Sequence, residues 1–242
     1  MSIFALADLH LAVAHPEKDM KVFGPNWEGY MEKMAANWRK AVSDDDLVLL
    51  PGDISWAMRP QEARTDLEWI DALPGTKIMI RGNHDLWWGS LKKVREICPP
   101  SIIPLHHTAT TWNSTAIAGT RLWDSPDEYS FRKFTDFELG DEDKAAAIKI
   151  FERELGRLEL ACQALDPTAE RRIVMTHYPP ISSDLQPSRA AAILEKHHVD
   201  ICCFGHLHAI APGTPMFGTC NGVTYVNCAA DYVDFAPVLL TH

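Results

Sequence analysis

Five short apolar segments of this sequence each end in side chains that can bind a metal ion. The segments are IFALADLH, LVLLPGD, KIMIRGNHD, RIVMTHYPP and ICCFGHLH. Short apolar runs bounded by turn residues are typical of buried strands. In an open α/β sheet the carboxyl ends of the strands form the ligand crevice, so side chains that follow different strands meet there. The pattern predicts a sheet whose polar strand ends converge on one site.

Helical patterns alternate with these strands, as they do in α/β folds. We expect helices over 27–42, 61–73, 88–97, 143–165 and 188–197, and further strands over 222–229 and 236–241. The helix over 143–165 has the clearest period, because its apolar residues recur at steps of three or four from Ala145 to Leu165. No helix is predicted between the last two strands. The fold class is therefore α/β with a mixed sheet.

The domain organisation is predicted to be simple. A chain of 242 residues can form one large α/β domain, and no repeat or linker-like stretch divides it. We therefore expect a single domain over 1–242. The segment 121–143 mixes aromatic and acidic residues without a sustained period. Long segments of this kind are usually functional lids or mobile surface, and the aromatic content favours a lid. We interpret it as a lid.

The charge of the chain bears on its partners. The formal net charge of -10 disfavours binding to nucleic acid or to an acidic membrane surface, because both need Lys and Arg to meet phosphates. A small anionic substrate would need local positive charge, which the positions of Lys and Arg do not show. We expect a small-molecule partner and neither nucleic acid nor a membrane.

The start of the sequence and its cysteines suggest a compartment. The first ten residues lack the charged region and cleavage site of a secretory signal, and no apolar run approaches 18 residues. The six cysteines show no C-x-x-C pair or disulfide framework, so we expect them to be reduced. These features predict a cytoplasmic protein.

Two of the strand endings place a pair of ligands two residues apart. In extended chain, residues i and i+2 lie on the same face, so Asp8 and His10 can point to one side, as can His206 and His208. Carboxylate and imidazole groups are suitable ligands for divalent transition metals. Either pair alone is more often a surface turn or a satisfied polar pair, but five such endings together favour a centre with two metal ions.

The other endings complete this set. Gly52 allows a sharp backbone turn after its strand, so that Asp53 can project over the strand end and bridge two ions with its two oxygens. Asn83 offers a neutral amide oxygen. Two divalent ions, two carboxylates and a bridging hydroxide leave a charge of roughly +1, which makes an anion site in an acidic protein.

Five further histidines lack this context and are predicted to be structural or on the surface: His15, His106, His107, His197 and His198.

The ordered set of motifs resembles the signature of the calcineurin-like metallophosphoesterases. The motifs are Asp8-x-His10, Gly52-Asp53, Gly82-Asn83-His84-Asp85, His177 and Gly205-His206-Leu207-His208. They run from residue 8 to residue 208 and so cover most of the chain. The stretches PGDISWAM and IRGNHDLWW further resemble a group of bacterial predicted phosphohydrolases.

The resemblance implies a fold and a ligand set. The implied fold is a four-layer sandwich of two mixed β-sheets flanked by helices, with two metal ions at the sheet ends. One ion would take Asp8, His10, Asp53 and His208, and the other would take Asp53, Asn83, His177 and His206. Mixed nitrogen and oxygen ligands suit Mn, Fe, Zn, Ni or Co, of which we favour Mn.

The resemblance also implies catalytic roles. A metal-bridging hydroxide would attack phosphorus in line. His84 would protonate or stabilise the leaving oxygen, and Asp85 would orient His84. Arg81, Arg121 and Tyr178 lie beside motif or lid segments, where they are candidates for substrate contacts or structural roles. Tryptophan is mainly a core residue, so we expect Trp87 and Trp88 to pack in the core rather than to form a substrate wall.

The expected function is hydrolysis of a small phosphoester, and a phosphodiester is favoured. The alternatives are a phosphomonoesterase, including a protein phosphatase, a nuclease of the same superfamily and a metal-binding scaffold without turnover. A nuclease predicts a basic groove, which the charge does not support. A scaffold predicts a degraded ligand set or loss of His84, and the sequence shows neither.

Overall fold

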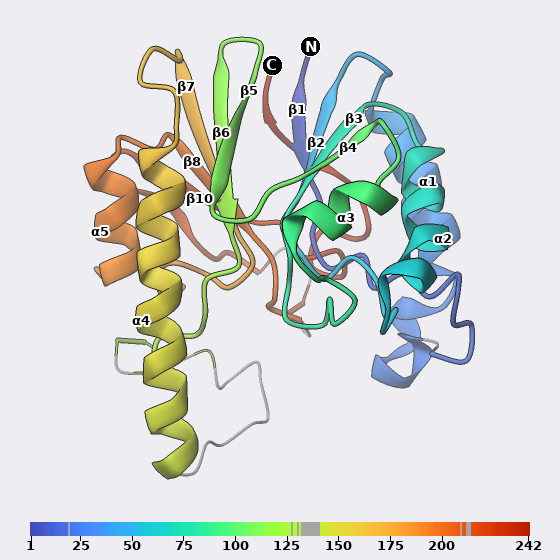
Figure 1. The fold of residues 1–242 in the computed structure, drawn as a ribbon, viewed down its shortest axis with the longest axis horizontal. Coiled ribbons are helices and arrows are strands. Elements are labelled where there is room, and N and C mark those ends of the chain that lie inside the picture. The colour runs from blue at the N-terminus through green and yellow to red at the C-terminus, as the bar shows by residue number, and fades with distance from the viewer. Residues whose placement is uncertain (19, 127, 130, 132–140, 209, 212–213) are drawn as a thin grey trace.

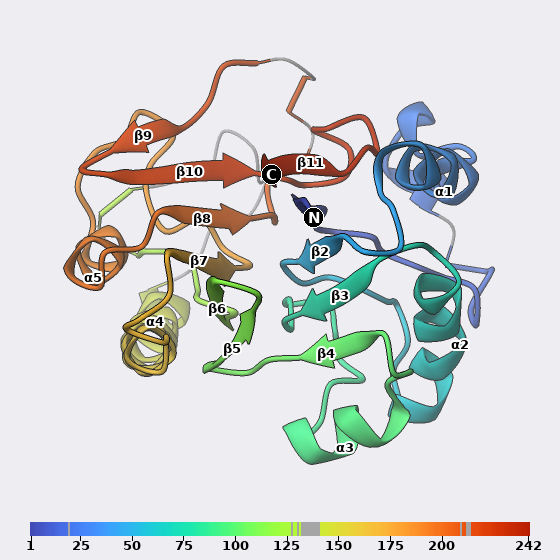
Figure 2. The same cartoon turned by 90° about the horizontal axis from the view of Figure 1, so that it is seen from above.

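The chain folds into two β-sheets that pack face to face between two layers of helices (Figures 1 and 2). The computed structural model describes residues 1–242 except 19, 127, 130, 132–140, 209, 212 and 213. This arrangement is the predicted four-layer α/β sandwich of two mixed sheets.

The first sheet has the strand order β11-β1-β2-β3-β4. Its strands are β1 (Ile3–Ala5), β2 (Leu47–Leu50), β3 (Thr76–Met79), β4 (Ile102–Pro104) and β11 (Val238–Thr241). Strands β1 to β4 are parallel, and β11 pairs antiparallel with β1. The carboxyl ends of β1, β2 and β3 therefore lie at the same edge.

The second sheet has the strand order β5-β6-β7-β8-β10-β9. Its strands are β5 (Thr108–Trp112), β6 (Thr115–Thr120), β7 (Arg171–Thr176), β8 (Ile201–Phe204), β9 (Gly218–Cys220) and β10 (Val223–Asn227). Strands β6, β7, β8 and β10 are parallel, and the two outer strands are antiparallel to their neighbours. The ends of β7 and β8 face the same end of the molecule as those of the first sheet (Figure 1).

The helices form the two outer layers. Helices α1 (Tyr30–Ala41), α2 (Pro60–Asp71) and α3 (Leu91–Ile97) cover the first sheet, and α4 (Asp141–Gln163) and α5 (Arg189–Lys196) cover the second (Figure 2). Two 3-10 turns precede α1, at Met20–Phe23 and Pro25–Trp27. Local signals set the starts of α3 and α5, where the Ser90 and Ser188 hydroxyls accept backbone hydrogen bonds as N-caps.

Three apolar clusters hold the layers together. The central cluster lies between the sheets and combines Leu49 and Ile78 from the first with Ile173 and Cys203 from the second. A second cluster lies between the first sheet and α1 to α3, and a third lies under α4 and α5. Trp87 and Trp88 are buried in the cluster under α1 to α3, which confirms their predicted core role.

The predicted elements match the observed ones with small shifts. The helix predicted over 143–165 is α4, and its bounds are two residues earlier at each end. The helix predicted over 27–42 begins later, because Pro25 and Trp27 belong to a 3-10 turn. The hairpin of β5 and β6 was not predicted, since β5 is rich in threonine and only partly buried. No helix among the described residues is long and apolar enough to cross a membrane.

Candidate metal centre

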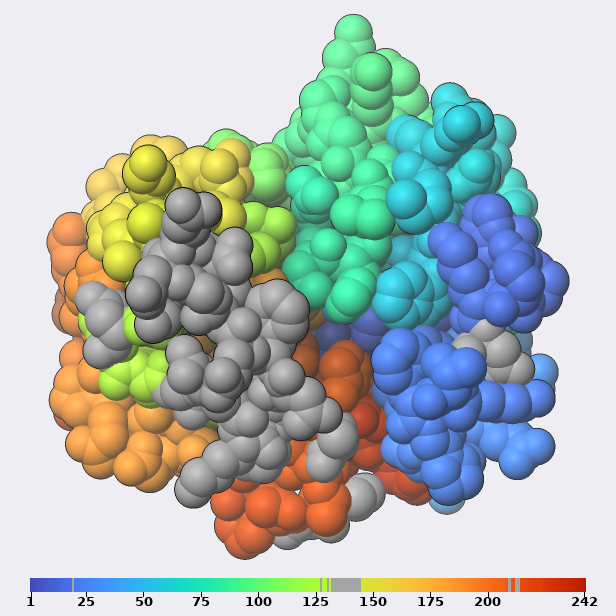
Figure 3. Space-filling view, turned by 90° about the horizontal axis from the view of Figure 1, so that it is seen from below, coloured from blue at the N-terminus to red at the C-terminus, as the bar shows by residue number. Residues whose placement is uncertain are grey.

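The polar residues that follow β1, β2, β3, β7 and β8 meet at one end of the two sheets. This end is the lower one in Figure 1, opposite both chain termini. Figure 3 views the molecule from this end and shows a central hollow with the deep-blue N-terminal segment at its bottom. The sequence therefore predicted correctly that the five strand endings converge.

The backbone turns sharply at four of the candidate ligands. Asp8, His10, Asp53 and His206 have positive φ angles of 58°, 44°, 52° and 70°. Such conformations are unfavourable for residues other than glycine by about 1 to 3 kcal/mol, and they cluster at functional sites. Backbone hydrogen bonds hold two of these turns in place: Asp8 N–H donates to the Gly52 carbonyl and His10 N–H to the Asp53 carbonyl, both at 3.0 Å.

Two glycines let the carboxylates approach the backbone. A Cβ at Gly82 would lie 2.0 Å from Asp53 Oδ1, and one at Gly205 would lie 2.1 Å from Asp8 Oδ2. Neither position can therefore hold a larger residue without displacing a carboxylate. The space at Gly82 allows the His84 N–H to donate to Asp53 Oδ1 at 2.8 Å. The glycines of the motifs thus set the positions of both carboxylates.

One group of side chains that could hold a metal ion consists of Asp8, His10 and His208. Their ligand atoms lie within 4.8 Å of one another. The Nε2 atoms of His10 and His208 are 3.2 Å apart, so both rings point at the same place. Asp53 is adjacent, with its Oδ2 3.8 Å from His10 Nε2.

A second group consists of Asp8, Asp53 and His177, whose ligand atoms also lie within 4.8 Å of one another. His177 Nε2 is 3.4 Å from Asp53 Oδ2 and 2.6 Å from Asn83 Oδ1. His206 Nδ1 is 3.1 Å from the same Asn83 oxygen. All seven predicted ligands are thus brought together, with Asp53 next to histidines of both groups.

Partners outside these groups fix the orientation of two imidazole rings. His208 Nδ1 lies 3.0 Å from Asp231 Oδ1, and His177 Nδ1 lies 3.0 Å from the Pro51 carbonyl oxygen. A carboxylate or carbonyl at Nδ1 keeps the proton there and leaves the Nε2 lone pair directed into the site. The sequence analysis missed Asp231 and Pro51.

The electrostatics of the site fit bound cations. Asp8 Oδ1 is buried without a hydrogen bond, which is costly for a carboxylate oxygen unless a cation lies beside it. Burial raises the pKa of Asp8 and of Asp53, and nearby histidines and backbone N–H groups offset this only in part. Burial lowers the pKa of His10, and that of His177 to about 3, so both imidazoles are neutral and able to coordinate.

His84 lies at the exposed rim of the site. Its ring centroid is 4.8 Å from that of Trp56 and 5.6 Å from that of His10. Trp56 in turn stacks on His10, with centroids 4.9 Å apart. The predicted acid is therefore next to the metal-binding groups, exposed to solvent and supported on one side by an indole that the sequence analysis did not single out.

Asp85 does not have the predicted role. It makes no hydrogen bond with the His84 ring among the described residues. Its buried carboxylate accepts N–H groups of Gly82 (2.8 Å), Ile54 (2.9 Å), Ser55 (3.1 Å) and the Trp87 indole (3.0 Å). Because these donors belong to the loops after β2 and β3, Asp85 ties the two loops together and so places Asp53 and Asn83.

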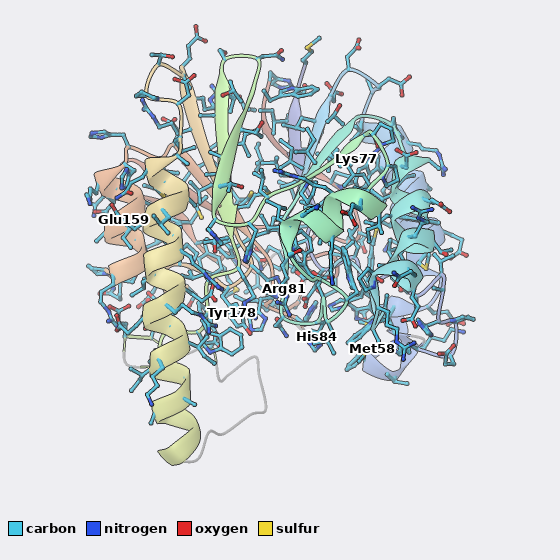
Figure 4. All side chains as sticks on the ribbon, in the orientation of Figure 1. Met58, Lys77, Arg81, His84, Glu159 and Tyr178 are labelled. Atoms are coloured by element: carbon cyan, nitrogen blue, oxygen red, sulfur yellow. The ribbon has the colours of Figure 1, made fainter. Side chains whose placement is uncertain are left out.

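Arg121 and Tyr178 lie beside the second group. The Arg121 carbonyl accepts the N–H groups of His177 (2.9 Å) and Tyr178 (3.1 Å). The Tyr178 ring is 4.0 Å from that of His206 and 4.8 Å from that of Trp123, and the Arg121 guanidinium lies over Trp123 at 4.6 Å. Figure 4 shows Tyr178, Arg81 and His84 at the same end of the sheets.

Positive charge gathers next to this site, contrary to the sequence analysis. Glu154 on α4 is fully buried and accepts hydrogen bonds from Arg121 (3.2 Å), Arg153 (3.3 Å) and Arg157 (2.7 Å). Arg81 is a further charged neighbour of this cluster. The four arginines come from three separate parts of the sequence, so their proximity could not be seen before the sheets were assembled.

The predicted lid is only partly covered by the described residues. Positions 127, 130 and 132–140 lie outside them, and 141–143 belong to α4. The described aromatics of this segment have packing roles: the Tyr129 hydroxyl donates to the Pro179 carbonyl at 2.7 Å, and Phe131 is buried against Leu207. The described part of the segment therefore packs against the loop that carries His206 and His208.

Two of the histidines predicted to be structural have ion-pair partners away from the site. His15 contacts Glu17 and Glu62, and His197 contacts Glu159. Neither His15 nor His197 belongs to the two candidate metal groups of the described residues.

Comparison with known proteins places the chain in a family. Residues 1–209 match the model of the calcineurin-like phosphoesterases. The chain belongs to this family, and it is a metal-dependent phosphohydrolase. A comparison with curated proteins gives no match.

Two solved structures with the same fold illustrate how far the likeness extends. A phosphopantetheinyl hydrolase from Mycobacterium tuberculosis has a TM-score of 0.55 and 15% identity, with 99% of this chain and 95% of that chain aligned. A protein of unknown function from Aquifex aeolicus has a TM-score of 0.51 and 15% identity, with 98% and 95% aligned. At 15% sequence identity these two structures show that the fold is shared, and they show nothing about the substrate.

Proposed function

We propose that this protein hydrolyses a small phosphodiester with two divalent metal ions held by the seven converging side chains. One observation carries the proposal: Asp53 Oδ2 lies 3.8 Å from His10 Nε2 and 3.4 Å from His177 Nε2. A single carboxylate between two sets of histidines is suited to bridge two ions. The mixed nitrogen and oxygen ligands favour Mn, with Fe, Zn, Ni and Co as alternatives.

The residues would divide as follows: Asp8, His10, Asp53 and His208 for one ion, and Asp53, Asn83, His177 and His206 for the other. When bound, two such ions supply Lewis acidity that polarises the phosphoryl group and lowers the pKa of an attacking water. Asp8 lies within 4.8 Å of histidine ligands in both groups, so it contributes to either position. Asp231 and the Pro51 carbonyl hold two of the imidazoles in the required tautomer.

His84 is proposed to protonate the leaving oxygen. It is exposed at the rim, where a substituent on phosphorus can reach it, and the Trp56 and His10 rings limit its movement. An alkoxide leaving from a diester needs a proton, so an acid at this position suits diester hydrolysis.

The charge of the site supports the same substrate class. Two ions, two carboxylates and one anionic oxygen ligand leave roughly +1, which matches a singly charged diester. The net charge of -10 disfavours a nucleic-acid substrate. A phosphomonoesterase is the second candidate, because Arg81 and Arg121 would favour a dianionic monoester if they contacted the same phosphoryl group.

The test compares kcat/KM for bis(p-nitrophenyl) phosphate and p-nitrophenyl phosphate with Mn²⁺ present. We expect the diester to be the better substrate and Asp53→Asn to abolish both activities. A monoester preference of tenfold or more would show that the enzyme is a phosphomonoesterase.

A further inference from the structure

Arg81 is partly buried, and no described carboxylate forms an ion pair with it. It follows β3 and immediately precedes Gly82 and Asn83, so its side chain starts within about 7 Å of a candidate metal ligand. Its Nε is buried without a hydrogen bond, and the guanidinium makes no ion pair among the described residues. An Arg that is partly removed from water and unpaired is unfavourable unless a bound anion completes the site.

The carboxylates near Arg81 already accept hydrogen bonds from other donors. Asp85 accepts hydrogen bonds from four N–H groups. Glu154 Oε1 accepts hydrogen bonds from Arg121, Arg153 and Arg157. Three guanidinium groups therefore contact Glu154, and Arg81 is a fourth charged neighbour that contacts no described carboxylate, in a protein with a net charge of -10. The four arginines outnumber the two acidic neighbours of Arg81, Asp85 and Glu154.

This excess charge is connected to the metal centre. The Arg121 carbonyl fixes the backbone of His177 and Tyr178. A row of ring contacts then runs from the Arg121 guanidinium over Trp123 and Tyr178 to His206. A substrate held at the metals could extend along this row towards the arginines. Figure 4 shows Arg81 at the same end of the sheets as Tyr178 and His84.

We propose that Arg81, supported by Arg121, binds a second anionic group of the substrate, a phosphate or a carboxylate carried by a substituent on the reacting phosphoryl group. The inference rests on the proposed function and narrows it to small phosphodiesters that carry a further oxyanion. Guanidinium groups bind phosphate and carboxylate in the same two-pronged geometry, so both are included. The arginines then recognise the substituent, and the metals alone hold the reacting phosphoryl group.

A binding experiment tests this independently of turnover. The ligands are ethyl phosphate, phosphoglycolate and ethylene glycol bisphosphate, which share a phosphoryl group and differ in a neutral, carboxylate or phosphate tail. Isothermal titration calorimetry on Mn²⁺-loaded protein should show at least one charged-tail ligand binding about 10- to 100-fold more tightly than ethyl phosphate, the range expected for charge-assisted hydrogen bonds. The two charged tails tell phosphate recognition from carboxylate recognition.

Variants assign the effect to Arg81. Arg81→Gln should remove the tail preference and leave the affinity for ethyl phosphate within about threefold, and Arg81→Lys should retain part of the preference because it keeps the charge. Arg153→Gln is the matched control, since Arg153 contacts the same Glu154 but its side chain is 53% exposed. It should keep the full preference.

Three outcomes would overturn the inference: equal binding of all three ligands by the wild type, an unchanged preference in Arg81→Gln, or an equal loss of affinity for every ligand. In the second case Arg81 would add to the positive charge near Glu154 without contacting the ligand. Failure of the proposed function would give a different result. The protein would then not hydrolyse bis(p-nitrophenyl) phosphate, whether or not it binds the charged-tail ligands more tightly.

Discussion

At the scale of single residues, the metal ligands could be predicted because the type of residue determines which donor atoms it offers. Asp, Asn and His at strand ends have the same donor atoms in any fold, so Asp53 and Asn83 could be identified from sequence. Pro51 acts through its carbonyl, which every residue has, and Asp231 is far from the motifs it supports. Neither gives a signal in a single sequence.

His84 can be tested directly. We expect His84→Ala to keep its bound metal and to lose about 10² to 10⁴ in kcat, the usual range for a positioned acid or base. The loss should be smaller for esters with activated leaving groups, because such oxygens need less protonation. Kinetics on p-nitrophenyl and alkyl esters, with metal analysis of each sample, would measure this.

The control for this variant is His15→Ala, since His15 contacts Glu17 and Glu62 on the surface and not the site. It should keep wild-type kcat. Equal losses for activated and unactivated esters in His84→Ala would indicate that His84 positions the substrate without transferring a proton.

At the scale of the elements, fully buried strands could be predicted from the sequence and partly buried strands could not. All four residues of β2 are buried, and its run of Leu and Val is easily recognised. Strand β5 consists of three Thr, one Ala and one Trp and is only partly buried, so its pairing with β6 sets its structure more than its own apolar pattern does. The register of these strands depends on partners that a single sequence does not identify.

The contact between α4 and α5 has a pH dependence that can be measured. Glu159 on α4 accepts hydrogen bonds from Lys196 (2.8 Å) and His197 (2.9 Å) at the end of α5. These contacts lower the pKa of Glu159 from 4.5 to about 2, and the hydrogen bond from Lys196 has the largest effect. Because the folded-state pKa is the lower one, the stabilisation is present above about pH 4.5 and is lost as the pH falls towards 2.

We therefore expect Glu159→Gln to lower Tm at pH 7 by about 2 to 4 °C, the shift given by ~1 kcal/mol in a chain of this size. Thermal unfolding between pH 7 and pH 3 should show this difference shrinking below pH 4.5. Glu170→Gln, at an exposed position, is the control and should match the wild type. A difference that does not change with pH would mean that packing, and not the ion pairs, accounts for the effect.

At the scale of the whole molecule, the site exists only because two sheets meet. The first sheet carries Asp8, Asp53 and Asn83, and the second carries His177 and His206, so each sheet alone holds part of the ligand set. The parallel strands direct all these ends to one side, which the sequence could predict. The arginines around Glu154 depend on how α4 packs on β6, which it could not.

The most direct test of the account is the rate of bis(p-nitrophenyl) phosphate hydrolysis as a function of Mn²⁺ bound per chain. Two ions that share Asp53 predict that the full rate appears only when two Mn²⁺ are bound, and that Asp53→Asn reaches neither that occupancy nor that rate. A full rate with one ion per chain, or no hydrolysis with two ions bound, would contradict a phosphoesterase that works with a pair of metals.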